Sequence, residues 1–535
     1  MVDRAAQQLH GKNQLGAALS AQGSKSFRGF NPKTSEWLEP VFSQATGGEV
    51  DAALALAREA TPVLRRARPE TIATLLETAA EEMLALGDSL LERAAQETGL
   101  DLQRLTGERA RTTTQMRLFA DVVKEGSWVD ARIDTALPDR KPLPRPDLRR
   151  ILTPVGPVAV FGASNFPLAF SVAGGDTVSA LAARNPVVVK AHPAHPGTSE
   201  LAAQAIARAV ERCRFPEGTF SMVHATDPEI SLALVRHPAV KAVAFTGSLA
   251  AGRAIFDAAA QRPDPIPAFV EMGSINPVFV LPGALQKSSD DIAHGLLNSI
   301  NLGAGQFCTC PGVIAGRSDA AFQQFAENLA ALFSQAPRAT MLHPGILRGY
   351  DDGIRRALGV AGVRAHHSSS PPSPALTSAA PVLLEADANT WLSNPALSEE
   401  IFGPASIVIH AERDEDLLEV AQRLPGSLTA TVFGDAGDLE HYSELIAILE
   451  TKAGRLIFNG YPTGVEVTYA MHHGGPYPAT ADPKFTSVGT AAILRFARPV
   501  CYQNFPDAHL PPELANENTR GIWRTINGQL TKNNL

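Results

Sequence analysis

A cysteine in a loop of small residues is the most reactive group that the sequence offers. Cys308 lies in residues 303–312, between a segment with helical spacing at 291–301 and an apolar one at 313–315. Small residues let the backbone approach a bound molecule, and glycine also adopts positive φ angles. A thiolate at Cys308 can attack a carbonyl carbon once a neighbour lowers its pKa or accepts its proton. The alternative is a small, buried hydrophobic side chain.

Two carboxylates stand at places where a catalytic base is useful. Glu271 ends an apolar run and precedes a turn at Gly273, and Glu400 opens the run 400–404. A carboxylate at the end of a buried strand can take a proton from water. The alternative for both is an ordinary surface ion pair.

Metal binding is not expected from the spacing of the thiols and imidazoles. Cys308 and Cys310 supply only half of a tetrahedral site, and the remaining cysteines, Cys213 and Cys501, stand alone. The adjacent pair at 472–473 is two histidines without a third ligand in its neighbourhood. We therefore expect no metal site, and place this pair in a loop near the substrate entrance.

Four motifs occur together in one order: Asn165-Phe166-Pro167, the run 269–277 around Glu271, the run 303–312 around Cys308, and Glu400-Ile401-Phe402-Gly403-Pro404. With them the chain resembles the aldehyde dehydrogenase superfamily from about Phe30 to the C-terminal region. The resemblance implies an α/β fold with a doubly wound parallel-sheet cofactor domain, an α/β catalytic domain and a small β oligomerisation arm. It also implies a homo-oligomer, a dimer or a tetramer.

The resemblance implies a covalent mechanism with roles for individual residues. Cys308 attacks the aldehyde, and the side chain of Asn165 and the backbone N–H of Cys308 hold the oxyanion. Loss of hydride to the nicotinamide leaves a thioester, which water activated by Glu271 hydrolyses. Glu400 matches the residue that binds the nicotinamide ribose, and Phe402 the one that packs beside it.

The cofactor sheet lacks a Gly-x-Gly-x-x-Gly fingerprint, so other groups must hold the diphosphate. Gly247 and Ser248 lead from a strand into a helix, whose N-terminus attracts phosphate; the alternative is a plain N-cap serine. The resemblance places this turn against the diphosphate and Lys190 against the adenosine ribose. Pro193 stands where NAD-preferring relatives usually have a carboxylate, so we expect NADP to be used, with NAD possible.

The far end of the substrate is predicted to be charged. Arg111, Gln115 and Phe119 are spaced as one face of a helix, and Arg111 aligns where relatives have an apolar residue of the substrate tunnel. An arginine there can hold a carboxylate; the alternative is that it faces solvent or pairs with Glu108. The substrate contacts expected from these motifs are Arg111, Gln115, Phe166 and Phe307. The closing motifs at 459–465 and 471–476 look most like bacterial NADP-linked enzymes that act on 2,5-dioxovalerate, the semialdehyde of α-ketoglutarate.

Composition sets the class of protein. A chain of 535 residues is too long for one core, and 44% hydrophobic and 19% charged residues are typical of globular proteins. The net charge of −8 argues against nucleic acid as a general partner. No apolar run is long enough to cross a membrane, residues 1–26 do not read as a signal peptide, and four cysteines suit the cytoplasm.

Alternating patterns predict the elements and the domains. A cofactor-binding domain is expected over 1–129 and 151–270, a catalytic domain over 271–491, and the arm with a tail over 130–150 and 492–535. The expected elements are a hairpin at 27–42, helices within 48–99 (one starting at Pro69) and at 101–123, an extended arm at 130–150, strands at 155–161, 187–189, 218–224 and 240–245, helices at 167–183 and 198–213, strands at 277–281 and 312–315, helices at 290–301 and 319–333, an irregular loop at 365–381, and a late strand at 492–502.

Three other activities remain open at this point. A general or fatty aldehyde dehydrogenase would share all these residues. An enzyme that transfers the acyl group to coenzyme A often lacks the base, which here is present as Glu271. A non-catalytic relative would be expected to lose Cys308, Asn165 or Glu271, yet all three stand.

Overall fold

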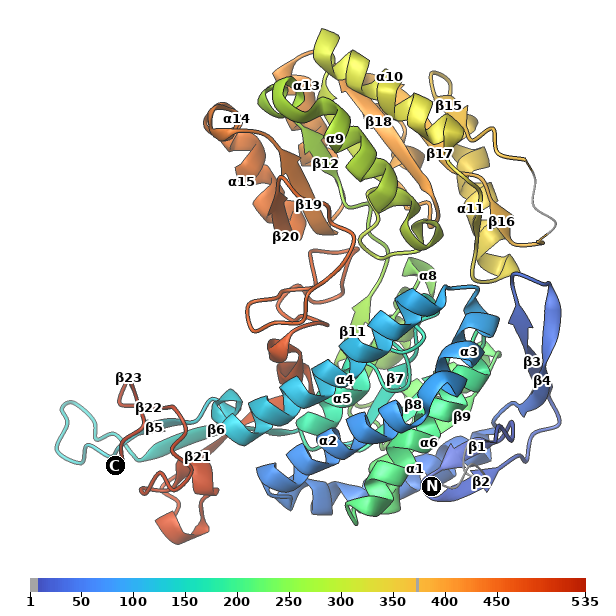
Figure 1. Cartoon of the computed structure of the whole chain (residues 1–535). Helices are drawn as coiled ribbons and strands as arrows, with labels where there is room; N and C mark the ends of the chain where they lie inside the picture. The colour runs from blue at the N-terminus through green and yellow to red at the C-terminus, as the bar shows by residue number, and fades with distance from the viewer. Residues whose placement is uncertain (1–7, 372–374) are drawn as a thin grey trace.

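The computed structural model describes residues 8–371 and 375–535. Two lobes, each built on a sheet covered by helices, lie one above the other, and a narrow arm projects from the lower lobe (Figure 1). Of the predicted polar N-terminal segment, residues 1–7 lie outside the described residues. Within the described residues no helix is long and apolar enough to cross a membrane.

The lower lobe contains the predicted doubly wound sheet. Its strands run in the order β11-β10-β7-β8-β9-β1-β2, and the first five are parallel. This order places the carboxyl ends of the parallel strands along one edge, where such sheets bind nucleotides. The bounds are β1 (Asn13–Leu15), β2 (Ala18–Ser20), β7 (Val158–Phe161), β8 (Val187–Ala191), β9 (Phe220–His224), β10 (Ala242–Thr246) and β11 (Ala268–Glu271).

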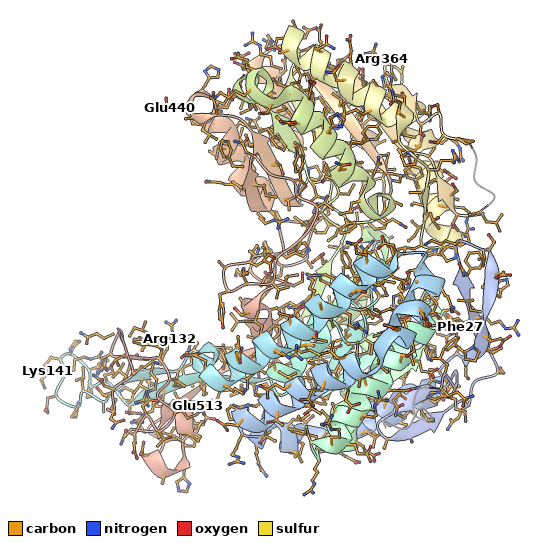
Figure 2. The ribbon with its side chains drawn as sticks, viewed as in Figure 1. Phe27, Arg132, Lys141, Arg364, Glu440 and Glu513 are labelled. Atoms are coloured by element: carbon orange, nitrogen blue, oxygen red, sulfur yellow. The ribbon has the colours of Figure 1, made fainter. Side chains whose placement is uncertain are left out.

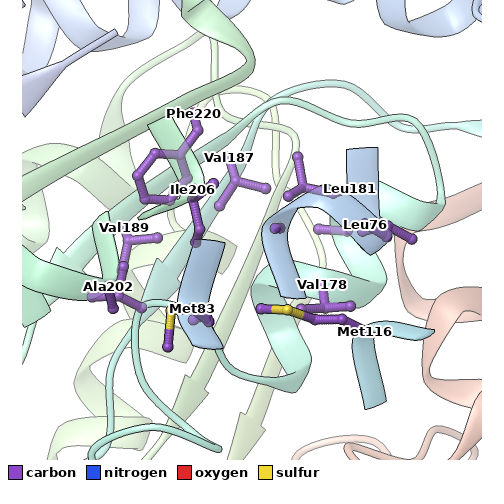
Figure 3. Packing of buried hydrophobic residues seen from close by; sticks show 14 of the residues in the cluster. Leu76, Met83, Met116, Val178, Leu181, Val187, Val189, Ala202, Ile206 and Phe220 are labelled. Carbon is purple, nitrogen blue, oxygen red and sulfur yellow. The ribbon is translucent and has the colours of Figure 1, made fainter. Parts of the chain in front are cut away.

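Helices bury both faces of this sheet. Val187 and Val189 of β8 lie in one core with Met83 and Ile206 (Figure 3), while Val188 between them lies in the core of the opposite face. Alternate side chains of a strand point to opposite faces, so a strand buried on both sides reads as a continuous apolar run. The helices are α1 (Gly47–Arg66), α2 (Pro69–Ala85), α3 (Gly87–Thr98), α4 (Leu102–Glu125), α5 (Gly175–Ala182), α6 (Pro196–Arg212), α7 (Pro228–Arg236) and α8 (Leu249–Ala260).

The upper lobe has a second sheet with the order β15-β17-β18-β13-β12-β19-β20. All its strand pairs are parallel except β15–β17. Its strands are β12 (Val278–Val280), β13 (Val313–Arg317), β15 (Arg364–His367), β17 (Val382–Asp387), β18 (Ala405–Ala411), β19 (Ser427–Phe433) and β20 (Ala453–Phe458). Its helices are α9 (Pro282–Asn301), α10 (Ala320–Gln335), α11 (Pro344–Leu358), α12 (Ala388–Ser393), α13 (Asp414–Arg423), α14 (Ala436–His441) and α15 (Ser443–Lys452).

The arm is a third sheet, in which the predicted extended segment meets the late strand. β6 (Leu148–Pro154) pairs antiparallel with β21 (Ala497–Gln503), and the sheet continues through β5 (Arg132–Asp134), β22 (Arg524–Ile526) and β23 (Gln529–Thr531). The C-terminus lies on it (Figure 1). Figure 2 shows Arg132 and Lys141 on this arm, away from both lobes.

Several local predictions are confirmed. The hairpin is β3 (Ser26–Asn31) with β4 (Glu36–Ser43), and Pro69 is the first residue of α2. Asp101 caps α4 by accepting a hydrogen bond from the backbone N–H of Arg104 at 2.7 Å. Each of these rests on short-range chemistry, which a sequence window contains in full.

Only the second half of the helix predicted at 167–183 is confirmed, as α5. The segment before it is a compact loop, in which the N–H of Gly174 donates to the carbonyl of Ser171 at 2.9 Å and the N–H of Gly175 to that of Ala169 at 3.0 Å. Gly174 lies so close to the carbonyl of Ala169 that a Cβ would be 2.6 Å away. The carboxylate of Glu108, from α4, fixes the start of the loop by accepting from the backbone N–H groups of Leu168 and Ala169 at 2.8 and 2.9 Å.

Two further predictions need correction. Within 365–381, β15 adds an antiparallel strand to the upper sheet and β16 (Ser378–Ala379) pairs with β14 (Ala339–Thr340), so only part of the segment is irregular; residues 372–374 lie outside the described residues. The late strand begins at Ala497, because residues 490–496 form a 3₁₀ helix. Sheet pairing with a distant strand decided the first case, and it is not visible in a local pattern.

Candidate active site

Cys308 lies in a loop that crosses closely over residues of the upper lobe. The loop follows α9 and contains positive φ angles at Gly303, Ala304 and Gly305. A Cβ on Gly305 would lie 2.1 Å from the carbonyl oxygen of Gly403, so only glycine permits this crossing. The side-chain amide of Asn276 donates to the carbonyls of Cys308 and Cys310 at 2.9 Å each, which fixes the end of the loop.

The thiol meets a histidine and a carboxylate. Cys308 Sγ is 3.4 Å from His473 Nε2, and the same nitrogen is 3.2 Å from Glu271 Oε1. Ser487 donates its hydroxyl to Glu271 Oε2 at 2.5 Å. His473 and Glu271 are almost completely buried, with exposures of 1% and 3%.

The segment that carries His473 reaches the site by pairing with the lower sheet. After β20 the chain returns to the region between the lobes (Figure 1). There the N–H of Met272 donates to the carbonyl of Ala479 at 2.8 Å, and the N–H of Ala481 to that of Val270 at 3.1 Å. His473 is thus aligned with Glu271 at the end of β11. The sequence analysis placed this histidine near the substrate entrance and missed its contact with Cys308.

Burial disfavours the thiolate form of Cys308. Burial raises the pKa of the Cys308 thiol well above its ordinary value, Glu271 and Glu400 raise it further, and Arg111 opposes them. For Glu271 burial pushes the pKa upward, but His473 and Ser487 outweigh it and the net shift is downward. The thiol therefore needs a base, and the imidazole of His473 is in hydrogen-bonding contact with it.

Asn165 is held in place by two contacts. Its side-chain amide nitrogen donates to the carbonyl of Gln306, in the loop of Cys308, at 3.0 Å. Its backbone carbonyl accepts from Arg104 Nη2 at 2.8 Å. The Arg104 guanidinium lies 5.1 Å from the ring centre of Phe166 and 4.7 Å from that of Phe307. Arg104, which the sequence analysis did not single out, joins the two predicted aromatic residues.

Arg111 neither faces solvent nor forms an ion pair with Glu108 among the described residues. It is largely buried, and its Nε and Nη2 atoms have no hydrogen-bond partner among the described residues. Its guanidinium lies 5.1 Å from the ring centre of Phe170 and 5.9 Å from that of Phe166. One carboxylate oxygen of Glu108 accepts hydrogen bonds from two backbone N–H groups, and in the described part of the chain Glu108 forms no ion pair with Arg111.

A pocket of about 540 Å³ opens between α4 and the nucleophile loop. Arg111 and Arg104 line it, together with Phe166 and Phe307. Burial lowers the pKa of both guanidinium groups, and Glu108 opposes the shift in each case. Two carboxylates, Glu108 and the exposed Asp101, also line the pocket. The two largely buried guanidinium groups, with free donor atoms on Arg111, make it suitable for an anionic group.

The remaining residues of that helix face do not point into the pocket. Gln115 is buried against the first turn of α5, where a Cβ on Gly175 would be 2.7 Å from its Nε2. Phe119 is fully buried in the lower core. Of the three residues on this face, Arg111 is the one that lines the pocket beside the loop of Cys308. The substrate role of Gln115 stays a prediction.

Residues suited to a nicotinamide cofactor lie along the carboxyl edge of the lower sheet. Lys190 lies near the end of β8, has no acidic partner among the described ion pairs, and burial lowers its pKa to about 8. Ser248 caps α8 by accepting from the N–H of Ala251 at 3.4 Å, and the N–H of Gly247 donates to the carbonyl of Glu271 at 3.1 Å. The N-terminus of α8 thus lies beside Glu271.

Glu400 and Phe402 approach from the upper lobe. Both line a small cavity beside Cys310 and Ser274. Burial raises the pKa of Glu400 to about 7, with the N–H of Ser274 opposing the shift. A Cβ on Gly273 would lie 2.7 Å from Glu400 Oε2, so this glycine admits the carboxylate. The lone Lys190, the α8 N-terminus and this buried carboxylate fit a cofactor bound across both lobes.

Fold and site together define a class of protein. A doubly wound sheet with its nucleotide edge turned toward a cysteine in contact with a histidine and a carboxylate suits a cofactor-dependent enzyme that works through a covalent thioester. The model of the aldehyde dehydrogenase family matches residues 19–349. The chain belongs to the aldehyde dehydrogenase family, whose members oxidise aldehydes with NAD or NADP.

Two curated relatives match nearly the whole chain. The alpha-ketoglutaric semialdehyde dehydrogenase of Acinetobacter baylyi is 47% identical over 98% of this chain and 99% of its own length. Alpha-ketoglutaric semialdehyde dehydrogenase 2 of Azospirillum brasilense is likewise 47% identical, over 98% of this chain and 99% of its length. These matches confirm the predicted membership of the superfamily.

Solved structures confirm the predicted fold. An NADP-dependent enzyme of E. coli has a TM-score of 0.78 at 21% identity, covering 94% of this chain and 99% of the other. A 3,6-anhydro-L-galactose dehydrogenase in complex with NADP also has a TM-score of 0.78 at 21% identity, covering 92% of this chain and 99% of that one.

Proposed function

We propose that this protein oxidises 2,5-dioxovalerate to the dicarboxylic acid, with NADP as the preferred cofactor. The proposal is supported by the names of the two relatives that match almost the whole chain. The observation that carries it is Arg111, a buried guanidinium with two donor nitrogens free and Cys308 close enough to affect its pKa. A short aldehyde with a carboxylate at its other end satisfies both groups at once.

The first step is attack by the sulfur of Cys308 on the aldehyde carbon. His473 Nε2 takes the thiol proton, and the positive charge that forms on its ring is stabilised by Glu271 at 3.2 Å. One N–H of Asn165 is donated to Gln306. Its other N–H and the backbone N–H of Cys308 hold the oxyanion.

NADP, when bound, would supply the hydride acceptor for oxidation of the thiohemiacetal to a thioester. The residues that would hold it, as their places on the two lobes suggest, are Lys190, Gly247, Ser248, Glu400 and Phe402. Glu271 then takes a proton from water, which attacks the thioester and releases Cys308. Coenzyme A as the acyl acceptor is the second candidate; the buried carboxylate beside the sulfur favours water, and assays with and without coenzyme A distinguish the two.

Replacing Arg111 by methionine is expected to raise KM for 2,5-dioxovalerate by about 10-fold or more, because a charged hydrogen bond contributes roughly 1.5–3 kcal/mol. A simple aliphatic aldehyde of similar length should be affected little. Steady-state kinetics with both aldehydes checks this. Arg117→Met, on the exposed face of the same helix, is the matched control and should change neither KM. Equal losses for both aldehydes in Arg111→Met would remove this residue from the substrate site.

NADP is expected to have the higher kcat/KM, because no carboxylate follows Lys190 at the end of β8. The first acidic residue after it, Glu200, accepts hydrogen bonds from the N–H groups of His10 and Gly11 and so faces the N-terminal segment. Pro193→Glu should shift the NADP/NAD preference toward NAD by about 10-fold or more, through repulsion of the 2′-phosphate.

Pro193→Gln is the matched neutral control for this change, since it alters the backbone in the same way without adding a charge. It should leave the ratio of the two kcat/KM values close to that of the unmodified protein. Equal or better use of NAD by the unmodified protein would contradict the proposed preference.

We further propose a homo-oligomer, assembled through the arm and the free edge of the upper sheet. The edge strand β20 exposes Leu456 and Phe458 to solvent at 42% and 47%. An unpaired edge with apolar side chains is a surface that proteins normally cover.

We also propose a cytoplasmic location. The four cysteines are free thiols, in keeping with a reducing cytoplasm.

A further inference from the structure

We propose that Glu271, Cys308 and His473 form a binding site for a zinc-like divalent cation, which blocks the nucleophile reversibly. One potential ligand atom from each of these three residues lies within 4.8 Å of the other two. Among the described residues, they are the group of histidine, cysteine and carboxylate side chains close enough together to hold a metal ion. The inference goes beyond the proposed function, because it depends on the site alone and not on which aldehyde is oxidised.

The distances match the edges of a tetrahedron around zinc. Zinc bonds of about 2.3 Å to sulfur and about 2.0 Å to nitrogen or oxygen place tetrahedral ligand atoms roughly 3.3–3.6 Å apart. Cys308 Sγ and His473 Nε2 are 3.4 Å apart, and His473 Nε2 and Glu271 Oε1 are 3.2 Å apart. Two of the three ligand pairs thus already have the spacing of a zinc site, and the third pair, Cys308 Sγ and Glu271 Oε1, lies within 4.8 Å. A cation bound to the three side chains would leave the fourth position for water.

The carboxylate has a free oxygen aimed at this point. Glu271 Oε1 is buried and has no hydrogen-bond partner among the described residues, although His473 Nε2 is close by. The other oxygen accepts from the hydroxyl of Ser487 at 2.5 Å. The backbone N–H of His473 donates to Thr486 Oγ1 at 2.8 Å, which fixes the segment that carries the imidazole. Such outer hydrogen bonds orient metal ligands in proteins.

The chemistry of the ligands selects the kind of metal. Thiolate and imidazole suit zinc, cobalt and related ions, whereas magnesium and calcium need six or more oxygen ligands. On binding, the S–H bond of Cys308 breaks, a sulfur–metal bond forms and the proton leaves to solvent, with no electron transferred. The dication is neutralised by one thiolate and one carboxylate, which lowers the cost of burying it.

Direct metal binding tests this with the full-length protein freed of metal by chelation and titrated with Co²⁺ alone. We expect one cobalt ion per chain, with a sulfur-to-cobalt charge-transfer band in the near ultraviolet and the intense visible bands of four-coordinate cobalt. Cys308→Ser should lose the charge-transfer band. His473→Gln should weaken binding by more than about 100-fold, because loss of a ligand exceeds the loss of an outer hydrogen bond.

Matched controls are the neighbours that the structure keeps out of the cluster, Cys310→Ser and His472→Gln, which should bind cobalt as the unmodified protein does. Zn²⁺ should inhibit aldehyde oxidation, EDTA should restore it, and Mg²⁺ should have no effect. The proposal is overturned by a cobalt spectrum without the thiolate band, by cobalt binding that survives in both Cys308→Ser and His473→Gln, or by equal inhibition with Mg²⁺. Because binding is read without substrate, failure of the proposed substrate leaves this test intact.

Discussion

Replacement of Cys308 by alanine is expected to abolish aldehyde oxidation and any ester hydrolysis, lowering kcat by at least about 10⁴-fold, as loss of an essential nucleophile does. Cys310→Ala should keep most of the activity. Only Cys308 contacts a base, at 3.4 Å from His473 Nε2, whereas the thiol of Cys310 donates to the carbonyl of Ile300 at 3.7 Å. Steady-state rates of both variants check this.

Cys310→Ala also serves as the control for loop damage, because the Asn276 amide holds the carbonyls of both cysteines. Equal loss of activity in the two variants would point to a disturbed loop, and a larger loss in Cys310→Ala would reverse the assignment. Circular dichroism and thermal unfolding of each variant separate a folding defect from a chemical one.

Glu271→Gln is expected to keep a burst of reduced cofactor, about one per site, although a slower one because the neutral amide no longer stabilises the charged ring of His473. The variant should then turn over about 10²–10⁴-fold more slowly. The burst records formation of the thioester, and the slow phase records its hydrolysis, for which Glu271 is the proposed base. Stopped-flow absorbance of the reduced nicotinamide measures both phases in one experiment.

His473→Gln is the companion variant and should slow the burst itself. The pKa of the Cys308 thiol is raised, and without the imidazole the thiol loses the proton acceptor that it contacts. Raising the pH should recover part of this burst rate, since a more alkaline solution deprotonates the thiol directly. A burst lost in Glu271→Gln but intact in His473→Gln would exchange the two roles.

Patterns within short windows were sufficient for much of the fold. Alternating strands and helices predicted the doubly wound sheet, because Val187–Val189 of β8 is apolar throughout and is buried on both faces. Pro69 and Asp101 marked the starts of α2 and α4 correctly. The loop at 167–174 was missed, since its start is fixed by Glu108, a carboxylate some 60 residues earlier in the chain that accepts from the N–H groups of Leu168 and Ala169.

The residue types of the site were recognisable from the sequence, but their partners were not. Cys308, Glu271 and Asn165 lie in motifs that predict a functional role for them. Arg111 was predicted to contact the substrate from its position on a helix. His473 was not assigned, because its place beside Cys308 depends on hydrogen bonds between residues 479–481 and β11. A window around 472–473 contains no trace of that pairing.

The sequence by itself determined the family and much of the order of the elements, and it predicted the nucleophile, because each is encoded in neighbouring residues. Only the tertiary structure decided that Arg111 is largely buried without an ion pair among the described residues and that the thiol of Cys308 contacts an imidazole. Cys308 and His473 are 165 residues apart in the chain. Contacts over such a distance depend on how two sheets and the segment between them pack, and no local propensity specifies that packing.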